Sequence, residues 1–268
     1  MSMQVEGAVA SDVGCVRSAN EDGARLVSSG GDGAESSAWL AVVADGMGGH
    51  SAGEVASTIA VDTISQEFLW SSDEPGAALL DVVRTANRRI FDTAATADEL
   101  SGMGTTCTAL VLADWKAYLA HVGDSRLYLV RAGEIYSMTE DDSAVMEMVR
   151  QGILTREEAR SHADRNVILR ALGTHPAVEV SRWARPFPVR EGDRFVMSTD
   201  GLHDLVGDTE IRDTVLTRGR QQACARLIAA ARERGGPDNI TVVVLEVSSG
   251  GRPADEPKAT RILKEPSP

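Results

Sequence analysis

The chain has 268 residues, 43% of them hydrophobic and 25% charged, which is ordinary for a soluble globular protein with a sizeable core. Its 40 acidic residues outnumber its 27 basic ones, and the net charge of −13 argues against a protein built mainly to bind nucleic acid or an anionic membrane. No apolar run approaches the roughly 20 residues of a membrane-spanning helix, and residues 1–10 show no signal peptide.

Hydrophobic patterns predict strands and helices in separate groups. In chain order, they are a strand at 39–44, helices around 52–60 and 79–90, strands at 105–112, 117–122, 126–131 and 194–198, a helix around 224–231, and a strand at 240–247. The three strands between 105 and 131 are separated by short polar breaks and predict an antiparallel meander. Strands grouped with pairs of helices favour an α+β layered domain over alternating βαβ units.

Two segments differ from this core pattern. Residues 248–268 contain four of the nine prolines and no aromatic residue, which predicts a flexible tail. Residues 140–170 are polar and helical with few apolar residues, which predicts an excursion from the core. The three cysteines, Cys15, Cys107 and Cys224, form no disulfide or zinc pattern and favour a reducing cytoplasm.

Four aspartates border predicted strands and are candidates for chemistry. Asp45, Asp124 and Asp200 follow apolar runs, and Asp238 precedes the last strand. One Asp-Gly pair alone is typical of a turn. Four carboxylates at the edge of one sheet would instead repel one another, and a divalent cation would relieve that repulsion.

The candidate ligands are oxygen atoms, which favours a hard ion such as Mg²⁺ or Mn²⁺. The glycines that follow Asp45 would allow a backbone carbonyl to approach the ion closely. Two such ions can activate water for attack on a phosphoryl group. Arg17 is a candidate for gripping phosphate oxygens, because a guanidinium can bind them bidentately, although an ordinary surface role is also open.

Six motifs occur in an order that resembles the metal-dependent protein phosphatase 2C family, in its bacterial serine/threonine phosphatase branch. They are Arg17-Ser-Ala-Asn20-Glu21-Asp22, Asp45-Gly-Met-Gly-Gly-His50, Gly104-Thr-Thr106, Val122-Gly-Asp124-Ser-Arg126, Ser198-Thr-Asp200-Gly-Leu202 and Asp238-Asn-Ile-Thr241. The resemblance covers about residues 5–247. It implies a central antiparallel β-sandwich flanked by pairs of helices, a catalytic domain over 1–247, a flap over about 139–172, and a tail over 248–268.

The resemblance also implies a ligand set for Mn²⁺ or Mg²⁺, with two core ions and a third. Asp45 resembles the carboxylate that bridges the two core ions, and Gly46 the carbonyl ligand of the second ion. Asp200 and Asp238 resemble ligands of the first ion, and Asp124, with Asp200, resembles the third site.

Other positions resemble residues around the ions. Arg17 corresponds to the phosphate-binding residue, which makes Arg17 and Asp45 the candidate catalytic residues. Glu21 and Asp22 resemble residues that hold water around the ions. Asn239 would orient neighbouring ligands, although a structural turn role is equally open.

The chain departs from the family pattern at three places. Met47 stands where many animal members have a histidine proposed as general acid, so no proton donor is assigned, and His50 has a structural role in our interpretation. Asp141-Asp142 stands where bacterial relatives often have an aspartate and a histidine, which predicts a more acidic flap entrance. His203 replaces a small polar residue, and we expect it at the surface.

The implied activity is hydrolysis of phosphoserine and phosphothreonine on proteins. The expected partners are phosphorylated proteins and a bacterial serine/threonine kinase that the enzyme opposes, with type VI secretion as one candidate pathway. We expect a cytoplasmic monomer that binds neither nucleic acid nor membrane. The alternatives are a hydrolase of small phosphoesters and a catalytically silent, phosphatase-like binding module. All the ligand positions are occupied by suitable residues, which favours the active enzyme.

Overall fold

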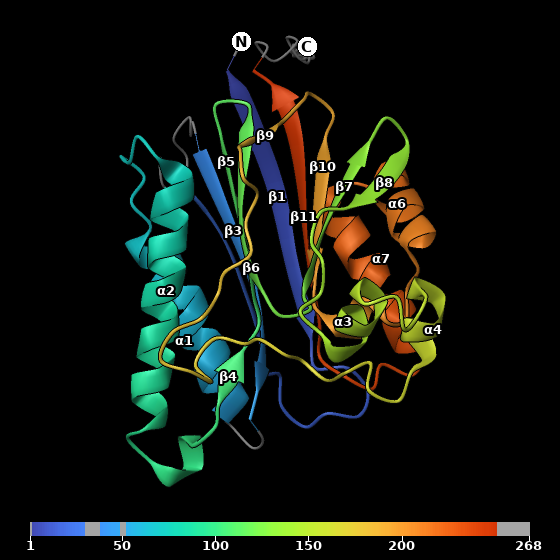
Figure 1. Ribbon diagram of the computed structural model, residues 1–268. Coiled ribbons are helices and arrows are strands. Elements are labelled where there is room, and N and C mark those ends of the chain that lie inside the picture. Colours follow the sequence, from blue (N-terminus) through green and yellow to red (C-terminus); the bar gives the residue numbers. More distant parts are fainter. Residues whose placement is uncertain (1, 30–37, 49–51, 251–268) are drawn as a thin grey trace, which may run out of the picture.

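Two antiparallel β-sheets lie face to face at the centre of the molecule (Figure 1). The computed structural model describes residues 2–29, 38–48 and 52–250. In spatial order, one sheet contains β1 (Met3–Asp12), β11 (Ile240–Ser249), β10 (Arg194–Ser198), β7 (Arg126–Arg131) and β8 (Glu134–Ser137). The other contains β2 (Asp22–Ser28), β3 (Ala38–Met47), β5 (Cys107–Ala113), β6 (Lys116–Val122) and β9 (Phe187–Pro188), and β4 (Gly104–Thr105) pairs with β3.

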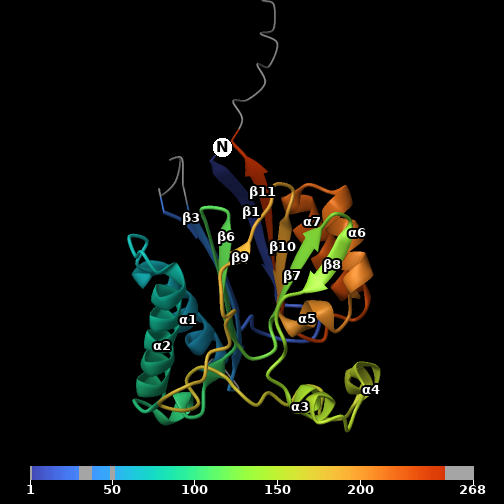
Figure 2. The same ribbon diagram turned by 45° about the horizontal axis from the view of Figure 1, so that its top comes forward.

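Helices cover the outer faces of both sheets and complete the predicted four-layer architecture. Helices α1 (Ala52–Glu67) and α2 (Pro75–Ala94) pack on the β3 sheet, followed by the short 3₁₀ helix Asp98–Leu100. Helices α6 (Asp208–Thr217) and α7 (Arg220–Glu233) pack on the β11 sheet, with the one-turn α5 (Asp200–His203) at its edge. Helices α3 (Ala144–Arg150) and α4 (Arg156–Ser161) project away from the sandwich in the flap (Figure 2).

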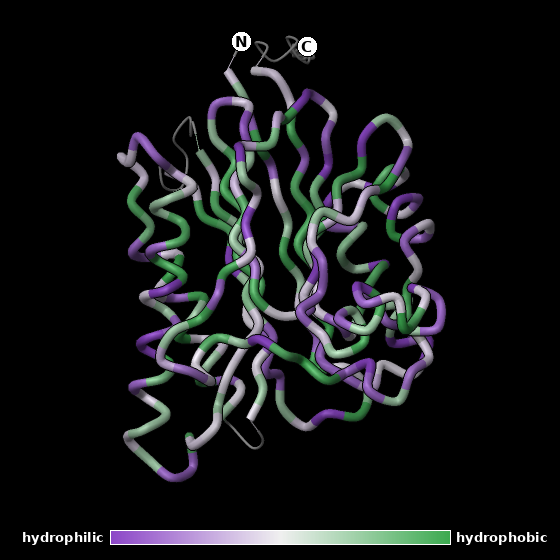
Figure 3. The backbone as a smooth tube through the Cα atoms, in the orientation of Figure 1, coloured by the Kyte–Doolittle hydropathy of each residue, from purple (hydrophilic) through white to green (hydrophobic). Residues whose placement is uncertain are grey.

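Alternation along the central strands builds three apolar layers, which appear as green segments inside the molecule in Figure 3. In β11, Val242 and Val244 face the α6–α7 pair, whereas Val243 and Leu245 face the other sheet. Side chains of a strand point to opposite faces in turn, and both faces are covered here. This explains why β11 is a nearly continuous valine run and not an alternating polar pattern.

The predicted meander is wrong in one respect. Strands β5 and β6 pair with each other, but β7 belongs to the opposite sheet, where it pairs with β10 and β8. The chain crosses between the sheets at Gly123, whose φ of 102° is unfavourable for any residue with a Cβ. A Cβ there would also lie 2.7 Å from the Thr106 side chain. The crossing brings Asp124 to the edge where the two sheets meet.

Several elements differ from the predicted bounds. Strand β3 continues to Met47, because Gly46 and Met47 pair with β4. Strand β11 ends at Ser249, two residues beyond the predicted boundary, because it pairs with β1 along its whole length. Strands β1, β2, β8 and β9 and helices α5 and α6 are additional to the predicted set. His50 and residues 251–268 lie outside the described residues. No helix in the described part of the chain is both long and apolar enough to cross a bilayer.

Candidate metal centre and active site

The predicted acidic residues come together at one edge of the sandwich. Asp45 lies near the end of β3, Asp124 follows β6, and Asp200 opens α5 directly after β10. Asp22 begins β2 and is paired in register with Asp45. These strands belong to two sheets, so the site forms only when the sheets stack. Segments that are far apart in sequence thereby contribute to one acidic cluster.

The electrostatics confirm that these carboxylates lie close together. Burial raises the pKa of Asp45 well above its usual range, and the charges of Asp200, Asp22 and Asp124 raise it further. Burial, followed by the charge of Asp200, raises the pKa of Asp124 in the same way. Burial and neighbouring carboxylates raise the pKa of Asp22 to about 7 and that of Asp200 to about 6. Such crowding is favourable only when protons or cations neutralise the charge.

The donor chemistry fits a hard divalent cation. Three carboxylate oxygens are buried without a hydrogen-bond partner, namely one Oδ1 each from Asp22, Asp124 and Asp200. Buried polar atoms normally find partners, so unpaired oxygens in one cluster point to an oxygen-binding ion. Among the described residues, no three acidic, histidine or cysteine side chains are already drawn together to hold a metal. Asp238, another expected carboxylate ligand, has an ion-pair partner in this structure.

That partner is Arg17, whose Nη2 lies 2.8 Å from Asp238 Oδ2. The Arg17 side chain is 50% exposed and extends from the loop between β1 and β2. The hydrogen bond that Arg17 donates to Asp238 raises the pKa of the Arg17 guanidinium, and the charges of Glu21 and Asp45 raise it further. Arg17 is therefore a fixed positive charge beside the acidic cluster, which is where an anionic substrate needs one.

Asn239 holds this loop in place through three side-chain hydrogen bonds. Its Oδ1 accepts from the backbone N–H of Glu21 at 2.8 Å, and its Nδ2 donates to the carbonyls of Val13 and Ala19 at 3.0 and 2.9 Å. Asn239 is buried. The geometry therefore gives Asn239 a role in positioning residues 13–21, and with them Arg17.

Two buried threonines are site residues that the motifs alone do not single out. Thr106 Oγ1 accepts from the Asp45 backbone N–H at 2.9 Å, and Thr199 Oγ1 donates to Asp22 Oδ2 at 2.9 Å. Both belong to quoted motifs, Gly104-Thr-Thr106 and Ser198-Thr-Asp200-Gly-Leu202, and that membership is the available sequence signal. They fix the backbone or the carboxylate orientation of the acidic cluster.

Gly46 lies in a densely packed part of the site. A Cβ at this position would come within 2.1 Å of the Gly53 carbonyl oxygen in α1 and 2.6 Å of the Glu21 carbonyl oxygen. The backbone N–H of Gly46 also donates to the Glu21 carbonyl at 3.2 Å. Glycine is needed here so that α1 and the β1–β2 loop can approach β3. A role for its carbonyl as a metal ligand stays a prediction.

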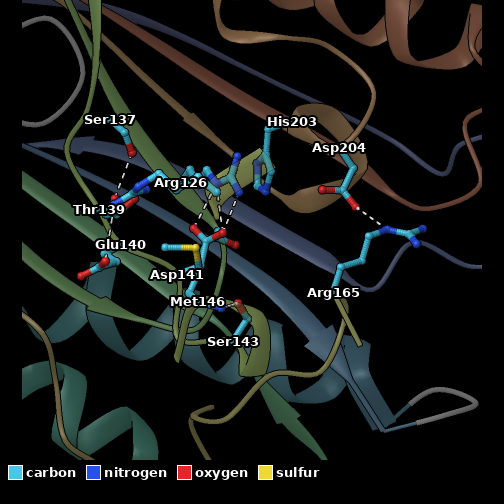
Figure 4. Close-up of polar contacts among 12 residues, drawn as sticks. Arg126, Ser137, Thr139, Glu140, Asp141, Ser143, Met146, Arg165, His203 and Asp204 are labelled. Atoms are coloured by element: carbon cyan, nitrogen blue, oxygen red, sulfur yellow. Dashed lines mark hydrogen bonds and ion pairs between the residues drawn. The ribbon is translucent and has the colours of Figure 1, made fainter. Parts of the chain in front are cut away.

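A cavity of about 570 Å³ opens beside the acidic cluster. Its wall includes Arg17, Asp124, Asp200 and Asp238 on the sandwich side, and residues of the flap on the other. Figure 4 shows the flap residue Arg165 reaching toward Asp204, just after α5, with 3.9 Å between Nε and Oδ2. The flap therefore forms one wall of a cleft that leads to the candidate metal centre.

One prediction about this cleft is wrong. His203 is a buried residue of the cleft wall, not a surface residue, and its Nδ1 lies 3.0 Å from Ser198 Oγ. Burial and the nearby Arg126 guanidinium lower its pKa well below the usual range, so it is neutral. At the flap entrance both predicted acidic residues have basic partners, Asp141 with Arg126 at 2.6 Å (Figure 4) and Asp142 with Arg170.

The fold and the site together define an α+β sandwich of two antiparallel sheets with an acidic edge whose oxygen donors fit a divalent cation. Comparison with known proteins gives the family. The protein phosphatase 2C family matches residues 28–234, and the chain belongs to this family.

Relatives of known name agree with this assignment. The serine/threonine protein phosphatase PstP of Mycobacterium tuberculosis is 41% identical over 248 residues, which make up 90% of this chain and 44% of PstP. The chain thus spans less than half of that relative's length.

Solved structures share the fold. A crystal structure of the PstP catalytic domain in complex with two manganese ions has a TM-score of 0.81 and 37% identity, and the match covers 92% of this chain and 100% of that one. A structure of PppA, described as a key regulatory component of T6SS in Pseudomonas aeruginosa, has a TM-score of 0.77 and 33% identity, with coverage of 91% and 97%.

Proposed function

We propose that this protein hydrolyses phosphoserine and phosphothreonine on proteins with the help of Mn²⁺ or Mg²⁺. The observation that carries the proposal is the group of buried, unpaired carboxylate oxygens from Asp22, Asp124 and Asp200 beside the cleft that Arg17 lines. Divalent cations in such a site polarise phosphoryl oxygens and lower the pKa of water. The serine/threonine specificity is inferred from the relatives' names.

The residues present divide into those that hold ions and those that hold the substrate. Asp45, Asp200, Asp238 and the Gly46 carbonyl would hold two core ions. Asp238 can join them because its ion pair with the half-exposed Arg17 is readily broken. Once Asp238 leaves this ion pair, the Arg17 guanidinium would be free to bind two phosphate oxygens.

Asp124 is proposed to hold a third, weaker ion together with Asp200. It stands at the crossing between the sheets, and its environment includes the charges of Asp200 and Asp141. Glu21 and Asp22 would order water around the core ions. Asp22 is already oriented by its hydrogen bond from Thr199.

The proposed cellular role is inferred from the relatives. The relatives are bacterial serine/threonine phosphatases, which supports a role opposing a serine/threonine kinase in the cytoplasm. A function in type VI secretion is supported by the likeness to PppA alone. We also propose that residues 1–247 form the catalytic unit, with the flap at about 139–172.

The activity is tested with a phosphothreonine peptide in the presence of Mn²⁺, with excess chelator as the control. We expect turnover that needs the ion and that disappears in Asp45→Asn, which keeps the shape of the side chain but removes its charge. A folded wild-type protein that binds Mn²⁺ and the peptide without releasing phosphate would support the silent binding module instead. Turnover in chelator with no residual metal would refute the metal-dependent reaction.

A further inference from the structure

The flap leaves and rejoins the sandwich through a narrow neck formed by residues 141–144 and 167–172. Two short contacts close this neck: Ala144 N–H donates to the Val167 carbonyl at 2.8 Å, and Leu169 N–H donates to the Asp142 carbonyl at 2.7 Å. Ser143 and Ile168 form an antiparallel bridge between them. The neck is therefore a two-stranded stem rather than a loose pair of linkers.

A buried ion pair joins the two strands of this stem. Arg170 Nη2 donates to Asp142 Oδ1, and the Asp142 side chain is only 2% exposed. The other side of the guanidinium donates to Glu179 Oε2 at 2.9 Å, but Glu179 is 81% exposed. A pair shielded from water is screened far less than an exposed one, so Asp142 is the partner that holds Arg170.

The same carboxylate ties the stem to the candidate metal centre. Asp142 Oδ2 accepts from the backbone N–H of Gly123 at 3.1 Å, and the Asp142 N–H donates to the Gly123 carbonyl at 2.7 Å. Gly123 directly precedes Asp124. On the exit strand, Leu172 exchanges backbone hydrogen bonds with Thr105, whose hydroxyl donates to the Asp45 carbonyl at 2.9 Å.

We propose that Asp142 and Arg170 form a clasp that fixes the flap relative to Asp124 and Asp45, and that both are positioning residues for the turnover of phosphoprotein substrates. This proposal rests on the proposed phosphatase function. Neither residue touches the reacting atoms. The clasp fixes the position of the flap beside the cleft, where a peptide substrate must fit. A small phosphoester needs only the metal-binding edge of the sandwich.

The test compares Asp142→Asn and Arg170→Gln with the control Glu179→Gln. Asn at 142 can still accept from Gly123 N–H but has lost the charge that Arg170 binds, and the control removes only the exposed partner of the same arginine. Each protein is assayed with Mn²⁺ on a phosphothreonine peptide and on p-nitrophenyl phosphate, and amide hydrogen exchange is measured for residues 139–172.

We expect kcat/KM for the peptide to fall about ten- to hundredfold in both clasp variants, with little change for p-nitrophenyl phosphate. Exchange at Ala144 and Leu169 should become faster, and Glu179→Gln should match the wild type. Unchanged exchange and peptide kinetics would overturn the clasp. Equal losses on both substrates would also overturn it, because the pair would then support the metal-binding edge and not the flap. A wild type inactive on both substrates would refute the phosphatase function, and hydrogen exchange would still decide whether the clasp exists.

Discussion

Arg17 has two possible partners at the candidate site, the Asp238 carboxylate and the phosphate of a substrate, and they compete for its guanidinium. In the described structure its guanidinium binds Asp238, which is also an expected metal ligand. A cation that recruits Asp238 would release Arg17 toward the cleft. Binding of the cation to Asp238 is thereby linked to the release of Arg17 for phosphate binding, through a single ion pair. Half-exposed pairs of this kind contribute little to stability, so the exchange requires little free energy.

Arg17→Ala should lower kcat/KM for a phosphothreonine peptide by the equivalent of about 1.5–3 kcal/mol, the typical value of a hydrogen bond to a charged group. The affinity for Mn²⁺ should be equal or higher, because Asp238 is no longer held. Steady-state kinetics and calorimetric metal titration measure the two effects. Arg226→Ala, which removes an exposed ion pair within α7, is the matched control. A loss of metal affinity in Arg17→Ala would assign Arg17 a structural role.

At the scale of elements, the site depends on how the β1–β2 loop is attached to the start of β11. Gly14, with φ of 82°, lets the loop turn so closely that a Cβ would lie 2.1 Å from the Asp238 carbonyl oxygen. Asn239 then bonds the backbone of the loop at three points. The loop has few apolar contacts of its own, since Cys15, Val16 and Arg17 are exposed. Its position is therefore set mainly by these hydrogen bonds.

Asn239→Ala should loosen residues 13–21 and destabilise the protein, at about 1–3 kcal/mol for each buried group left unpaired. Urea unfolding gives the stability, and amide hydrogen exchange gives the location of the effect. Asn239→Asp should be intermediate, because an aspartate still accepts from Glu21 N–H but cannot donate to the carbonyls of Val13 and Ala19. Wild-type exchange across residues 13–21 in both variants would show that the loop is held by other contacts.

At the scale of the whole molecule, stacking two sheets concentrates negative charge at one edge of a protein that is already acidic, with a net charge of −13. Asp22, Asp45, Asp124 and Asp200 all have raised pKa values, and burial is the largest cause for each. The metal-free fold thus retains protons that the unfolded chain has lost. Ion binding should release those protons and stabilise the molecule.

This predicts an unusual pH dependence for the metal-free protein. The pKa of Asp22 rises from 3.8 to about 7 on folding, so between about pH 4 and pH 7 the folded state binds more protons than the unfolded state. The contribution of Asp22 to the unfolding free energy must then fall as the pH rises through this window. Asp22→Asn, which can still accept from Thr199, should show a shallower fall. Urea titrations in chelator across this range measure the difference, and parallel curves for the two proteins would contradict the raised pKa.

Much of the fold and the candidate site could be predicted from local pattern. The apolar runs locate β3, β5, β6, β7, β10 and β11, and helical spacing locates α1, α2 and α7. The aspartates beside predicted strands predict an acidic, oxygen-donating site, because carboxylates at strand ends can meet at one edge of a sheet. The order of the six motifs is enough to predict the family that the comparison then shows.

Other features depend on partners that are distant in the sequence, and only the tertiary structure decided them. Whether β7 extends the β5–β6 pair or crosses to β10 depends on which sheet offers a free edge, and a local apolar pattern is the same in both cases. His203, at the end of α5, is buried in the cleft wall, where its ring lies against Ser198 of β10. Asp141 and Asp142 are adjacent in sequence, yet Asp141 pairs with Arg126 of β7 and Asp142 with Arg170 at the end of the flap. The residue types determined which chemistry is available, whereas burial and pairing, which arise when distant segments pack together, determined where each charge is held.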